Sequence, residues 1–552
     1  MAQVKTSYEQ LAQWASDTPE RVFLTQPLDG DVREWTFAQA FDDTARFAQG
    51  LLDSGLVAGD RVAILSKNCA EWVIADAAIA MAGLISVPIY PTAGPDTIGY
   101  VLTHSGALAV IVGRLDKPAI IESCVPDGVR VIGMRYPGVR CTDTMQALID
   151  ASEPHAPVKS PAADDVMTIL YTSGSTGQPK GVVLSYRAYE YACTACVTRY
   201  GLSADDRIMS YLPLAHVTER TASVGPCLFA GTPIYFLDRL ETFVEDLKRG
   251  RVTMFISVPR LWVKFQSGVH QSMAPKKLKF LLSLPVIGPM VARRVRDKLG
   301  FADCRRFGCG SAPVSPRTLR WYLRLGIAIS EGWGMSETCG LSCTNLPFEE
   351  KRLGTIGQPL SGTEMKVSDN GEILIRSPAV MTEYYNLPEL TAEVFTDDGF
   401  FRTGDKGEWD ESVEAFRITG RVKDQFKSAK GKYVAPVPIE GKLAGDPLVE
   451  QVCVMGAGLP AAVAVLVLSA TAHERPREAM DEHLLELLEI VNGTLESHER
   501  LSHLVVAADE WTIENKLLTP TMKIKRDQLE ERYAAQLSNL GAAKIVWRAP
   551  AN

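Results

Sequence analysis

Short apolar runs rich in β-branched residues recur through the first half of the sequence, and stretches with helical spacing separate several of them. The runs cover residues 61–65, 84–90, 107–113, 166–171, 207–212, 232–237 and 253–258. Alternation of strands and helices is typical of largely parallel sheets covered by helices, so we expect an α/β fold. Three later runs lie close together with turn residues between them, at 364–368, 371–377 and 414–420. Their spacing favours a small, barrel-like antiparallel sheet.

The pattern changes after about residue 420. Short strand candidates precede a helix near 476–493, in which apolar residues follow the i, i+3, i+4, i+7 spacing of a buried helical face. We therefore divide the chain into a large N-terminal domain, residues 1–420, and a small α+β C-terminal domain, residues 421–552. The junction at Gly420-Arg421 carries no Pro/Ser-rich spacer. A short junction suits two domains that move about a hinge, so we expect a mobile C-terminal domain.

The net charge and the cysteines exclude some classes of protein. The 552 residues include 58 Lys and Arg against 66 Asp and Glu, a net charge of −8, which argues against a nucleic-acid binder. The first residues lack the basic and apolar stretches of a secretory signal, so we expect a cytoplasmic protein with reduced thiols. Cys193 and Cys196 form a C-x-x-C, but their surroundings predict one turn of a helix instead of a metal or redox site.

One segment is long and uncharged enough to be mistaken for a membrane span. Residues 452–472 carry no charge, but Gly456, Gly458 and Pro460 interrupt them near the start. Two buried strands joined by a turn account for this segment better, because β-branched residues dominate its flanks.

The strongest local motif is YTSGSTGQPKG, residues 171–181, in which an apolar strand runs directly into a loop rich in Gly, Ser and Thr. Glycines allow backbone N–H groups to converge on an anion, and hydroxyls add donors. Lys180 adds a positive charge. The spacing is not that of a Walker A loop. A flexible polar surface loop is the alternative, but the place of the loop directly after a buried strand favours phosphate binding.

This loop resembles the signature loop of the adenylate-forming superfamily, which includes acyl-CoA synthetases, peptide-synthetase adenylation domains and firefly luciferase. Further similar motifs follow in the family's order: YLPLAHVTER, GSAP, GWGMSET, RTGD, GRVKDQFKSAKGKYVAP and LTPTMKIKR. The similarity spans nearly the whole chain and is closest to long-chain fatty acyl-CoA synthetases. It implies a large N-terminal domain of α/β subdomains and a small mobile C-terminal domain, in agreement with the pattern above.

The resemblance also implies a reaction. A medium- or long-chain fatty acid would react with ATP, with Mg²⁺ as cofactor, to give acyl-adenylate and pyrophosphate, and coenzyme A would then take the acyl group and release AMP. Such chemistry needs positioning and positive charge more than a protein nucleophile. The alternatives are an aryl-CoA ligase, a fatty acyl-AMP ligase that loads a carrier protein, and, from another class, a nucleotide-binding module without turnover.

Residues that match the family's nucleotide site are assigned by the resemblance. Trp333 would lie near the adenine, Asp405 would accept from the ribose hydroxyls, and Arg421 would contact ribose or phosphate. Each also has a structural alternative: a core tryptophan, a turn aspartate and a surface arginine. The remaining expected nucleotide contacts are Thr172, Ser173, Gly174, Ser175, Thr176, Gly177 and Lys180 in the loop, with Gly310, Ser311, Ala312, Gly334 and Ser336.

Three further residues would act in catalysis according to the resemblance. Glu337 would hold Mg²⁺, because a hard cation prefers carboxylate oxygen, and a solvated surface charge is the alternative. His216 would lie between the ATP and carboxylate sites, where a neutral imidazole can donate a hydrogen bond, and a buried, satisfied histidine is the alternative. Lys523 would reach the α-phosphate and carboxylate oxygens, although Lys525 and Arg526 beside it leave a plain basic turn as the alternative. Lys423 would act as the hinge and Gly431 would line the path of coenzyme A.

The acyl group would need an apolar tunnel, which we expect to be lined by the segment after His216 and by residues 307–310. Residues 280–298 combine apolar side chains with Arg293, Arg294, Arg296 and Lys298. Peripheral contact with a membrane and an ordinary helical connection with a basic end both remain open. Pro285 and Pro289 exclude one long amphipathic helix there. The protein would be a monomer or a homodimer.

Overall fold

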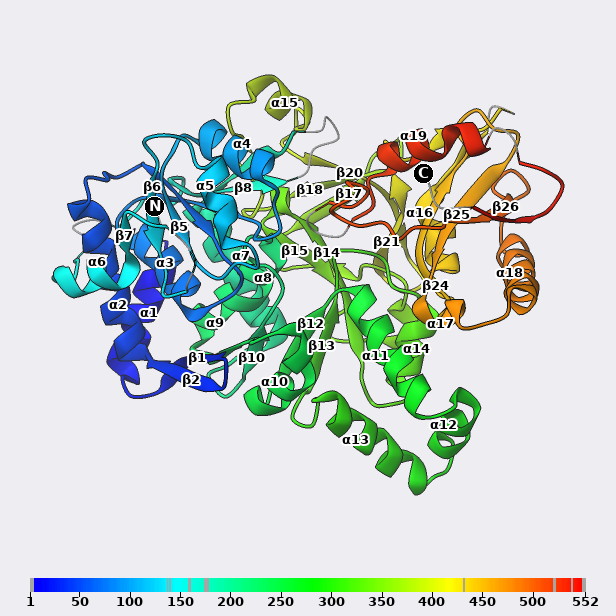
Figure 1. Ribbon diagram of the computed structural model, residues 1–552, viewed down its shortest axis with the longest axis horizontal. Coiled ribbons are helices and arrows are strands. Elements are labelled where there is room, and N and C mark those ends of the chain that lie inside the picture. Colours follow the sequence, from blue (N-terminus) through cyan, green and yellow to red (C-terminus); the bar gives the residue numbers. More distant parts are fainter. Residues whose placement is uncertain are drawn as a thin grey trace.

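The computed structural model describes residues 4–136, 138, 140–156, 160–172, 178–429, 432–519, 523–537 and 540–548. Figure 1 shows a large N-terminal region, coloured blue to yellow-green, with the yellow to red C-terminal domain beside its upper right part. The fold is α/β with a large N-terminal and a small C-terminal domain, as the sequence predicted.

An eight-stranded sheet forms the first layer, in the order β19-β9-β8-β4-β3-β5-β6-β7. Its central strands are parallel, whereas β8, β9 and β19 pair antiparallel at one edge. The strands are β3 (Arg61–Leu65), β4 (Ile85–Ile89), β5 (Ala107–Val112), β6 (Arg130–Gly133), β7 (Asp143–Thr144), β8 (Val166–Thr172), β9 (Lys180–Ser185) and β19 (Glu383–Tyr384).

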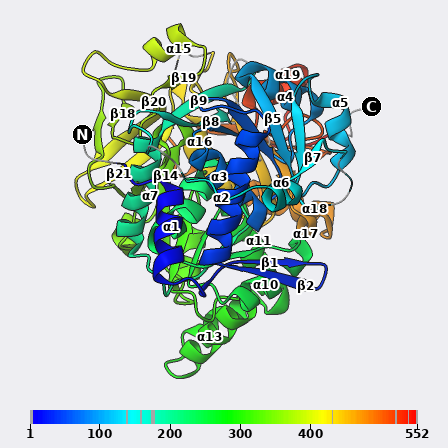
Figure 2. The ribbon, with the colours of Figure 1, turned by 90° about the vertical axis from the view of Figure 1, so that its left-hand side faces the viewer.

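Helices pack around this sheet, and Figure 2 shows α1, α2 and α3 together on the side that faces the viewer. Helix α3 is buried along its whole length: most of its residues are apolar or small, and its two acidic residues, Glu71 and Asp76, are buried as well. The helices are α1 (Ser7–Asp17), α2 (Phe37–Asp53), α3 (Ala70–Met81), α4 (Pro95–Ser105), α5 (Ile121–Cys124), α6 (Met145–Ala151) and α7 (Tyr186–Tyr200), with a short 3₁₀ turn at Pro118–Ile120.

The C-x-x-C cysteines lie on α7 one turn apart, as predicted, and both are fully buried. Burial raises the pKa of Cys196 to about 12, so this thiol is not reactive at neutral pH.

Two further sheets complete the main part of the N-terminal domain. One has the order β10-β11-β1-β2 and the other β12-β13-β14-β15-β16, parallel from β12 to β14 and antiparallel beyond. The strands are β1 (Val22–Leu28), β2 (Asp31–Thr36), β10 (Ile208–Ser210), β11 (Ile234–Phe236), β12 (Met254–Ser257), β13 (Arg306–Cys309), β14 (Ile329–Met335), β15 (Gly340–Thr344) and β16 (Gln358–Pro359).

Several helices and turns join these strands. They are α8 (Val217–Glu219), a π-helix at Arg220–Val224, α9 (Gly225–Ala230), a 3₁₀ turn at Leu240–Thr242, α10 (Phe243–Gly250), α11 (Pro259–Ser272), α12 (Pro275–Leu282), α13 (Ile287–Leu299), α14 (Pro316–Leu323), and 3₁₀ turns at Ser336–Thr338 and Glu350–Arg352. The buried guanidinium of Arg220 pairs with Asp76 of α3 at 2.7 Å and also bonds Thr168 and Ser86. This network fixes the chain just after His216 against the eight-stranded sheet.

A four-stranded antiparallel sheet, β17-β18-β20-β21, forms the half-barrel that the runs at 364–420 predicted. Its strands are β17 (Glu364–Val367), β18 (Glu372–Arg376), β20 (Phe401–Asp410) and β21 (Ala415–Arg421), and α15 (Pro388–Glu393) precedes β20. Strand β20 carries the RTGD motif in its middle, so Asp405 lies on a strand opposite Arg421 of β21.

The C-terminal domain has its own sheet, β24-β25-β26-β27, a small pair β22-β23 and its own apolar core. The elements are β22 (Phe426–Lys427), β23 (Tyr433–Val434), α16 (Pro436–Leu443), β24 (Val449–Met455), β25 (Ala462–Leu468), α17 (Ala470–His473), α18 (Arg477–Asn492), β26 (Leu501–Val506), α19 (Arg526–Leu537) and β27 (Ile545–Trp547). The uncharged segment 452–472 thus contains two buried strands joined by a turn, and its last residues begin α17. Among the described residues no helix is both long and apolar enough to cross a membrane.

Candidate active site

The predicted phosphate loop joins two antiparallel strands. Thr172 ends β8 and Lys180 begins β9, and the two residues pair in register, so the loop between them is the connection of a hairpin at one edge of the large sheet. Ser173, Gly174, Ser175, Thr176 and Gly177 lie outside the described residues. The described ends of the loop, Thr172 and Lys180, lie at the C-terminal end of β8 and at the start of β9.

Lys180 lies next to residues from two other motifs. Its ammonium is 5.2 Å from the centre of the Tyr384 ring. Desolvation and the positive charge of Lys423 lower the pKa of Lys180, while Glu337 raises it. Lys423 is exposed just beyond β21, so the residue expected at the hinge lies close to the predicted phosphate site.

Glu337 lies in the 3₁₀ turn that follows β14. Its Oε1 accepts a hydrogen bond of 2.9 Å from the Tyr384 hydroxyl, and its backbone carbonyl accepts from Met381. In the described part of the chain, Tyr384 is the one side chain that bonds this carboxylate. Glu337 is half-buried, so its second oxygen can face a ligand in the cleft.

Asp405 is held from two sides. Its Oδ1 accepts from the Arg421 guanidinium at 2.7 Å, and its Oδ2 accepts from the indole nitrogen of Trp333 at 2.9 Å. Asp405 is buried, whereas Arg421 is exposed. The attraction of Asp405 raises the pKa of Arg421. The tryptophan expected near the adenine thus also orients the carboxylate expected at the ribose.

Two backbone features shape the floor of this site. A Cβ atom on Gly334 would lie 1.6 Å from the carbonyl oxygen of Gly340, so only glycine allows the close approach of β14 to β15. Ser311 has φ of 68°, a left-handed conformation that is unusual for a residue with a side chain. Its hydroxyl lies 3.5 Å from that of Thr218. Such strained positions occur where the surrounding structure fixes them, often at functional sites.

His216 is a neutral imidazole. Its Nδ1 accepts from the backbone N–H of Thr218 at 3.1 Å, which leaves Nε2 as the donor. Desolvation, followed by the positive charge of Lys523, lowers its pKa to about 3. The imidazole therefore stays uncharged at physiological pH.

A buried polar network fixes the segment that carries His216. Glu219 accepts hydrogen bonds from the Ser210 hydroxyl at 2.7 Å and from the backbone N–H of Tyr211 at 3.0 Å. Asn68 donates to Ser210 at 2.8 Å and accepts from the backbone of Leu214 at 3.1 Å. Desolvation raises the pKa of Glu219 to about 7.

Lys523 of the C-terminal domain faces the N-terminal domain. Its side chain is exposed, yet the surroundings of its ammonium lower its pKa, first by desolvation and then by the charge of Arg421. Asp405 and Glu337 act in the opposite direction. The backbone of Lys523 is fixed by a reciprocal pair of hydrogen bonds with Thr519, at 2.8 and 3.0 Å.

Arg526, three residues after Lys523, points into the C-terminal domain instead. Arg526 pairs with Glu440 at 2.7 Å and donates to the carbonyl of Val454 at 2.6 Å, so it belongs to the interior of the C-terminal domain. The geometry therefore distinguishes Lys523 from Arg526, which the sequence alone did not.

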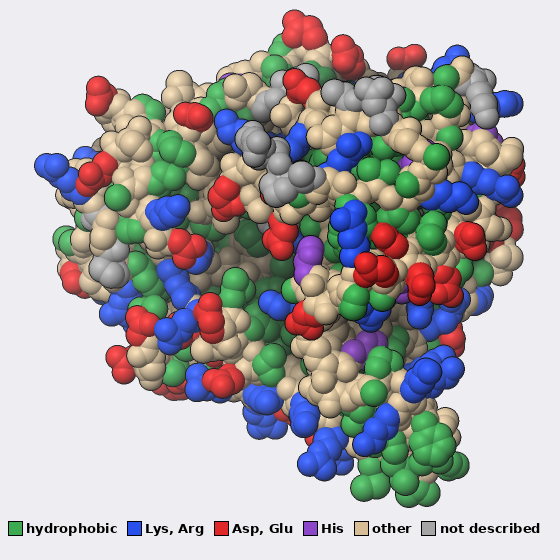
Figure 3. All heavy atoms as spheres, turned by 45° about the vertical axis from the view of Figure 1, so that its right-hand side comes forward, with side chains coloured by type: hydrophobic (Ala, Val, Ile, Leu, Met, Phe, Trp, Pro, Cys, Tyr) green, Lys and Arg blue, Asp and Glu red, His purple; other side chains and the backbone are tan. Residues whose placement is uncertain are grey.

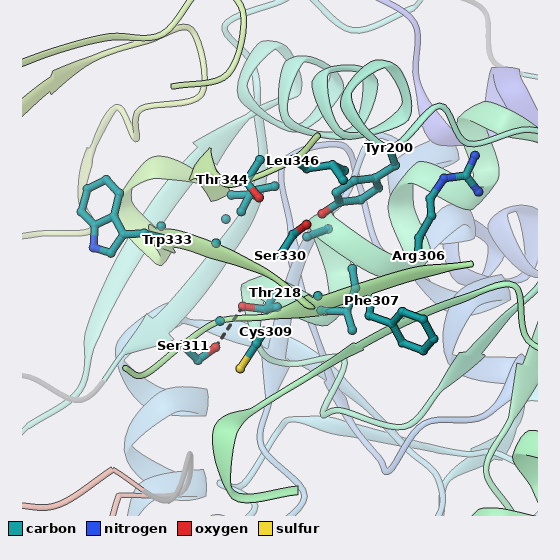
Figure 4. Close-up of a pocket in the computed structure, with 18 of the residues that line it drawn as sticks. Tyr200, Thr218, Arg306, Phe307, Cys309, Ser311, Ser330, Trp333, Thr344 and Leu346 are labelled. Atoms are coloured by element: carbon teal, nitrogen blue, oxygen red, sulfur yellow. Dashed lines mark hydrogen bonds between the residues drawn. The ribbon is translucent and has the colours of Figure 1, made fainter. Parts of the chain in front are cut away.

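A pocket opens beside Trp333 and Ser311 (Figure 4). Its walls include Thr218 and Ala222, which follow His216, and residues 307–310, so both segments predicted to line an acyl tunnel border the same cavity. Trp333 and Ser311 lie at one end, and Tyr200, Arg306 and Leu346 lie toward the other. The cavity volume is about 60 Å³. The Ser330 hydroxyl in its wall is buried and has no hydrogen-bond partner among the residues that the structure describes.

Gly310, Ser311, Trp333 and Gly334 line the pocket, and Ser336 begins the turn that carries Glu337. Hydrogen bonds or electrostatic interactions link most of the other predicted residues: Lys180, His216, Trp333, Glu337, Asp405, Arg421, Lys423 and Lys523. Ala312 is exposed beside Ser311, and Gly431 lies outside the described residues. The sequence did not single out Tyr384 or Thr218. Nothing in the local sequence around Tyr384 predicts its contact with Glu337, which lies 47 residues away.

Comparison with known proteins identifies the family. Residues 11–385 match the AMP-binding enzyme family, and residues 423–543 match the AMP-binding enzyme C-terminal domain. The chain belongs to the AMP-binding enzyme family. It is thus an adenylate-forming, acyl-activating enzyme. The two matches lie on either side of the predicted junction at Gly420-Arg421, whose exact position stays a prediction.

Individual members of the AMP-binding enzyme family are distant but similar over their full lengths. The chain is 29% identical to the long-chain-fatty-acid–CoA ligase FadD15 of Mycobacterium bovis, over 94% of each chain. It is 30% identical to fatty acyl-CoA synthetase A of Dictyostelium discoideum, over 95% of this chain and 88% of that protein.

Solved structures share the fold. The anthranilate CoA ligase AuaEII, in complex with anthranoyl-AMP, has a TM-score of 0.81 at 21% identity and covers 98% of both chains. The A domain of carboxylic acid reductase from Segniliparus rugosus has a TM-score of 0.79 at 22% identity, over 97% of this chain and 93% of that chain.

Proposed function

We propose that this protein is a fatty acid–CoA ligase. It activates a medium- or long-chain carboxylic acid with ATP to give acyl-AMP and pyrophosphate, and then transfers the acyl group to the thiol of coenzyme A with release of AMP. The proposal rests on membership of the AMP-binding enzyme family, on the full-length similarity to proteins named as fatty acid–CoA ligases, and on the arrangement of the cleft.

One observation carries the proposal. The electrostatic environment of Lys523 includes Arg421, Asp405 and Glu337, and Lys523 in turn lowers the pKa of His216. A lysine from the C-terminal domain therefore interacts electrostatically with Asp405, Glu337 and His216, which belong to three motifs of the N-terminal domain, and this supports the proposal. This arrangement suits adenylation, in which negative charge develops on the α-phosphate and needs stabilisation at that moment.

In the first half-reaction a carboxylate oxygen of the acid attacks the α-phosphorus of ATP, and the bond to the β-phosphate oxygen breaks as pyrophosphate leaves. Lys523 stabilises the charge on the α-phosphate, and the Nε2–H of His216 orients the incoming carboxylate. Asp405 accepts from the ribose hydroxyls, with Trp333 and Arg421 holding it in place. Lys180 and the loop that begins at Thr172 bind the phosphates that leave as pyrophosphate. No protein group forms a covalent bond.

The surroundings of Glu337 fit a magnesium ion. Within the described residues no three His, Cys, Asp or Glu side chains form a metal-binding cluster. A single half-buried carboxylate suits Mg²⁺, which in nucleotide sites is held by one or two carboxylates together with substrate phosphates. Such an ion would neutralise phosphate charge there. Tyr384 fixes the orientation of the Glu337 carboxylate through Oε1.

The second half-reaction needs a different arrangement of the domains. The thiol sulfur attacks the acyl carbon, its proton passes to solvent, and AMP leaves with the bonding electrons. Lys423 lies directly after β21, where a change in backbone dihedral angles would rotate the C-terminal domain and withdraw Lys523. The exposed ion pair Arg260–Glu450, at 2.9 Å, joins the domains in the present arrangement and is weak enough to allow this rotation.

The lining of the pocket suits an apolar acyl group, which would have to widen the pocket when it binds. Residues such as Met254, Ile256 and Phe307 give it a mostly apolar wall. A volume of about 60 Å³ has room for only a few water molecules. A long acyl tail would therefore have to displace side chains at the end near Tyr200.

A panel of acids tests the substrate. The full-length protein is incubated with ATP, Mg²⁺ and coenzyme A, and AMP is measured for acids from acetate to stearate and for benzoate. We expect the highest kcat/KM with a straight-chain acid of eight or more carbons. Higher efficiency with benzoate would favour an aryl-CoA ligase. Pyrophosphate release without transfer to coenzyme A would favour a ligase that loads a carrier protein.

A further inference from the structure

Helices α12 and α13 form a hairpin that projects from the N-terminal domain. In Figures 1 and 2 it extends beyond the rest of the molecule at the bottom of each view. Pro285 lies in the turn between the helices and Pro289 in the first turn of α13, so neither interrupts a helix interior. Leu278, Ala292 and Leu299 are buried and anchor the hairpin.

The end of the hairpin carries an apolar patch, which we call the tip. It consists of Phe280, Val286, Ile287 and Met290, whose exposed fractions are 62%, 75%, 45% and 68%. Figure 3 shows this green knob at the lower right, separated from other apolar surface. A contiguous, protruding group of large apolar side chains on a water-facing surface marks an interaction site.

Basic side chains surround the tip, and we call them the collar: Lys276, Lys277, Lys279, Arg293, Arg294 and Lys298. All six are exposed, and none forms an ion pair with any described residue. With Arg296 and the single acid Asp297, residues 275–299 have seven basic residues against one acidic residue, a local charge of +6 in a chain whose total is −8. Figure 3 shows blue side chains above the green knob.

The tip and the collar lie in a definite order along the hairpin. Phe280, Val286, Ile287 and Met290 lie at its free end, whereas the collar lies on the preceding part of α12 and the following part of α13, nearer the body of the protein. Proteins that bind a membrane surface have this arrangement: their apolar side chains enter the acyl region of the bilayer, while their basic side chains stay at the lipid headgroups. A protein partner would need an acidic groove, while an anionic bilayer supplies both environments over a flat area.

We propose that the α12–α13 hairpin docks the protein on a lipid bilayer with anionic headgroups, with the tip inserted and the collar at the phosphates. The remainder of the chain is acidic overall, so the attraction is confined to the collar and depends on salt. The tip and collar share no residue with the pocket or the cleft, so the proposal stands independently of the substrate.

Sedimentation with vesicles tests this proposal. Full-length protein is mixed with vesicles of phosphatidylcholine alone or with one quarter phosphatidylglycerol, at low and high salt. We expect binding to the anionic vesicles, weakened at least fivefold at high salt, and little binding to the neutral ones. The Ile287→Ser/Met290→Ser protein should bind at least tenfold more weakly, and Arg293→Gln/Arg294→Gln about tenfold more weakly.

Two control variants outside the hairpin show whether the loss of any exposed apolar or charged side chains weakens binding to vesicles. Val57→Ser/Leu240→Ser removes two apolar side chains that are 62% and 77% exposed, and Lys5→Gln/Arg140→Gln removes two exposed charges. Both should bind like the unmodified protein. Circular dichroism and thermal unfolding check that every variant is folded. Absence of binding to any vesicle, or equal binding by the tip variant, would overturn the proposal. So would a dimer in sedimentation velocity that the tip variant dissociates, because the tip would then be covered by a second copy.

Discussion

The indole nitrogen of Trp333 donates a hydrogen bond of 2.9 Å to Oδ2 of Asp405. The two residues belong to different sheets, and Arg421 occupies the other oxygen of the same carboxylate. The bond therefore fixes the position of the half-barrel sheet relative to the strand that leads to Glu337. It also gives Trp333 a role in orienting the proposed ribose ligand, beyond any contact of its ring with a base.

Replacing Trp333 by Phe keeps a ring and removes the donor. Since a hydrogen bond to a charged group contributes about 1.5–3 kcal/mol, we expect kcat/KM for ATP to fall by roughly tenfold or more. Steady-state kinetics of pyrophosphate release measures this. Trp409→Phe is the control, because Trp409 is partly exposed beside Phe416 and away from Asp405. Equal ATP kinetics in both variants would show that the indole bond has no role.

The pH profile of adenylation should carry an alkaline limb from Lys523. Its pKa lies below the usual 10.5, so its ammonium is lost, and the rate falls, at a lower pH than for a free lysine. His216 adds no limb above pH 5, because its pKa is about 3. We expect kcat/KM of the unmodified enzyme to decline at a pH below the range in which a free lysine loses its proton. In Lys523→Arg the rate is lower but the limb moves upward, since guanidinium stays charged. An unmoved limb would assign it to another group.

Glu331 should make stability depend on pH. Desolvation raises its pKa to about 8, and the backbone N–H of Gly354 and the charge of Arg417 only partly offset this. The folded state holds the proton more tightly than the unfolded state, whose pKa is near 4.5. The contribution of Glu331 to stability is therefore fully present below pH 4.5 and is lost as pH rises toward 8.

Glu331→Gln cannot ionise, so its melting temperature relative to the unmodified protein should rise by several degrees between pH 5 and pH 8.5. Differential scanning calorimetry measures this difference. Glu122→Gln, an exposed change on α5, should show no such trend. A difference that is constant with pH would mean that Glu331 is already ionised in the folded protein.

Tyr200 closes the end of the pocket that lies away from Trp333. Tyr200→Ala should lengthen the cavity and move the preferred acid toward longer chains by a few carbons, with kcat/KM for a long acid rising several-fold. The acid panel with AMP as product measures the shift. Thr198→Ala changes an exposed residue on the same helix and should leave the preference unchanged. An unaltered preference in Tyr200→Ala would place the end of the acyl chain elsewhere.

Much of the fold was readable from local patterns. The run at 61–65 coincides with β3, the uncharged segment 452–472 became two strands, and the helix with Leu484, Leu487 and Leu488 buries that face. Strand β20 was not predicted, because its central Thr403, Gly404 and Asp405 are typical of a turn and only pairing with β18 and β21 makes them a strand.

The site was predictable only as separate motifs. Their meeting in one cleft depends on contacts such as Trp333 with Asp405 and Tyr384 with Glu337, which join residues 72 and 47 positions apart. Neither partner has a local feature that points to the other. The raised pKa of Glu331 likewise arises from burial, which tertiary packing decides.

Single-turnover pyrophosphate release by Lys523→Ala tests the central claim most directly. Lys525→Ala is the matched control, because it removes a lysine two positions away that has no ion pair among the described residues. We expect Lys523→Ala to lose at least a hundredfold in adenylation while still transferring a supplied acyl-adenylate to coenzyme A, and Lys525→Ala to retain both steps. Adenylation at the unmodified rate in Lys523→Ala would contradict the account.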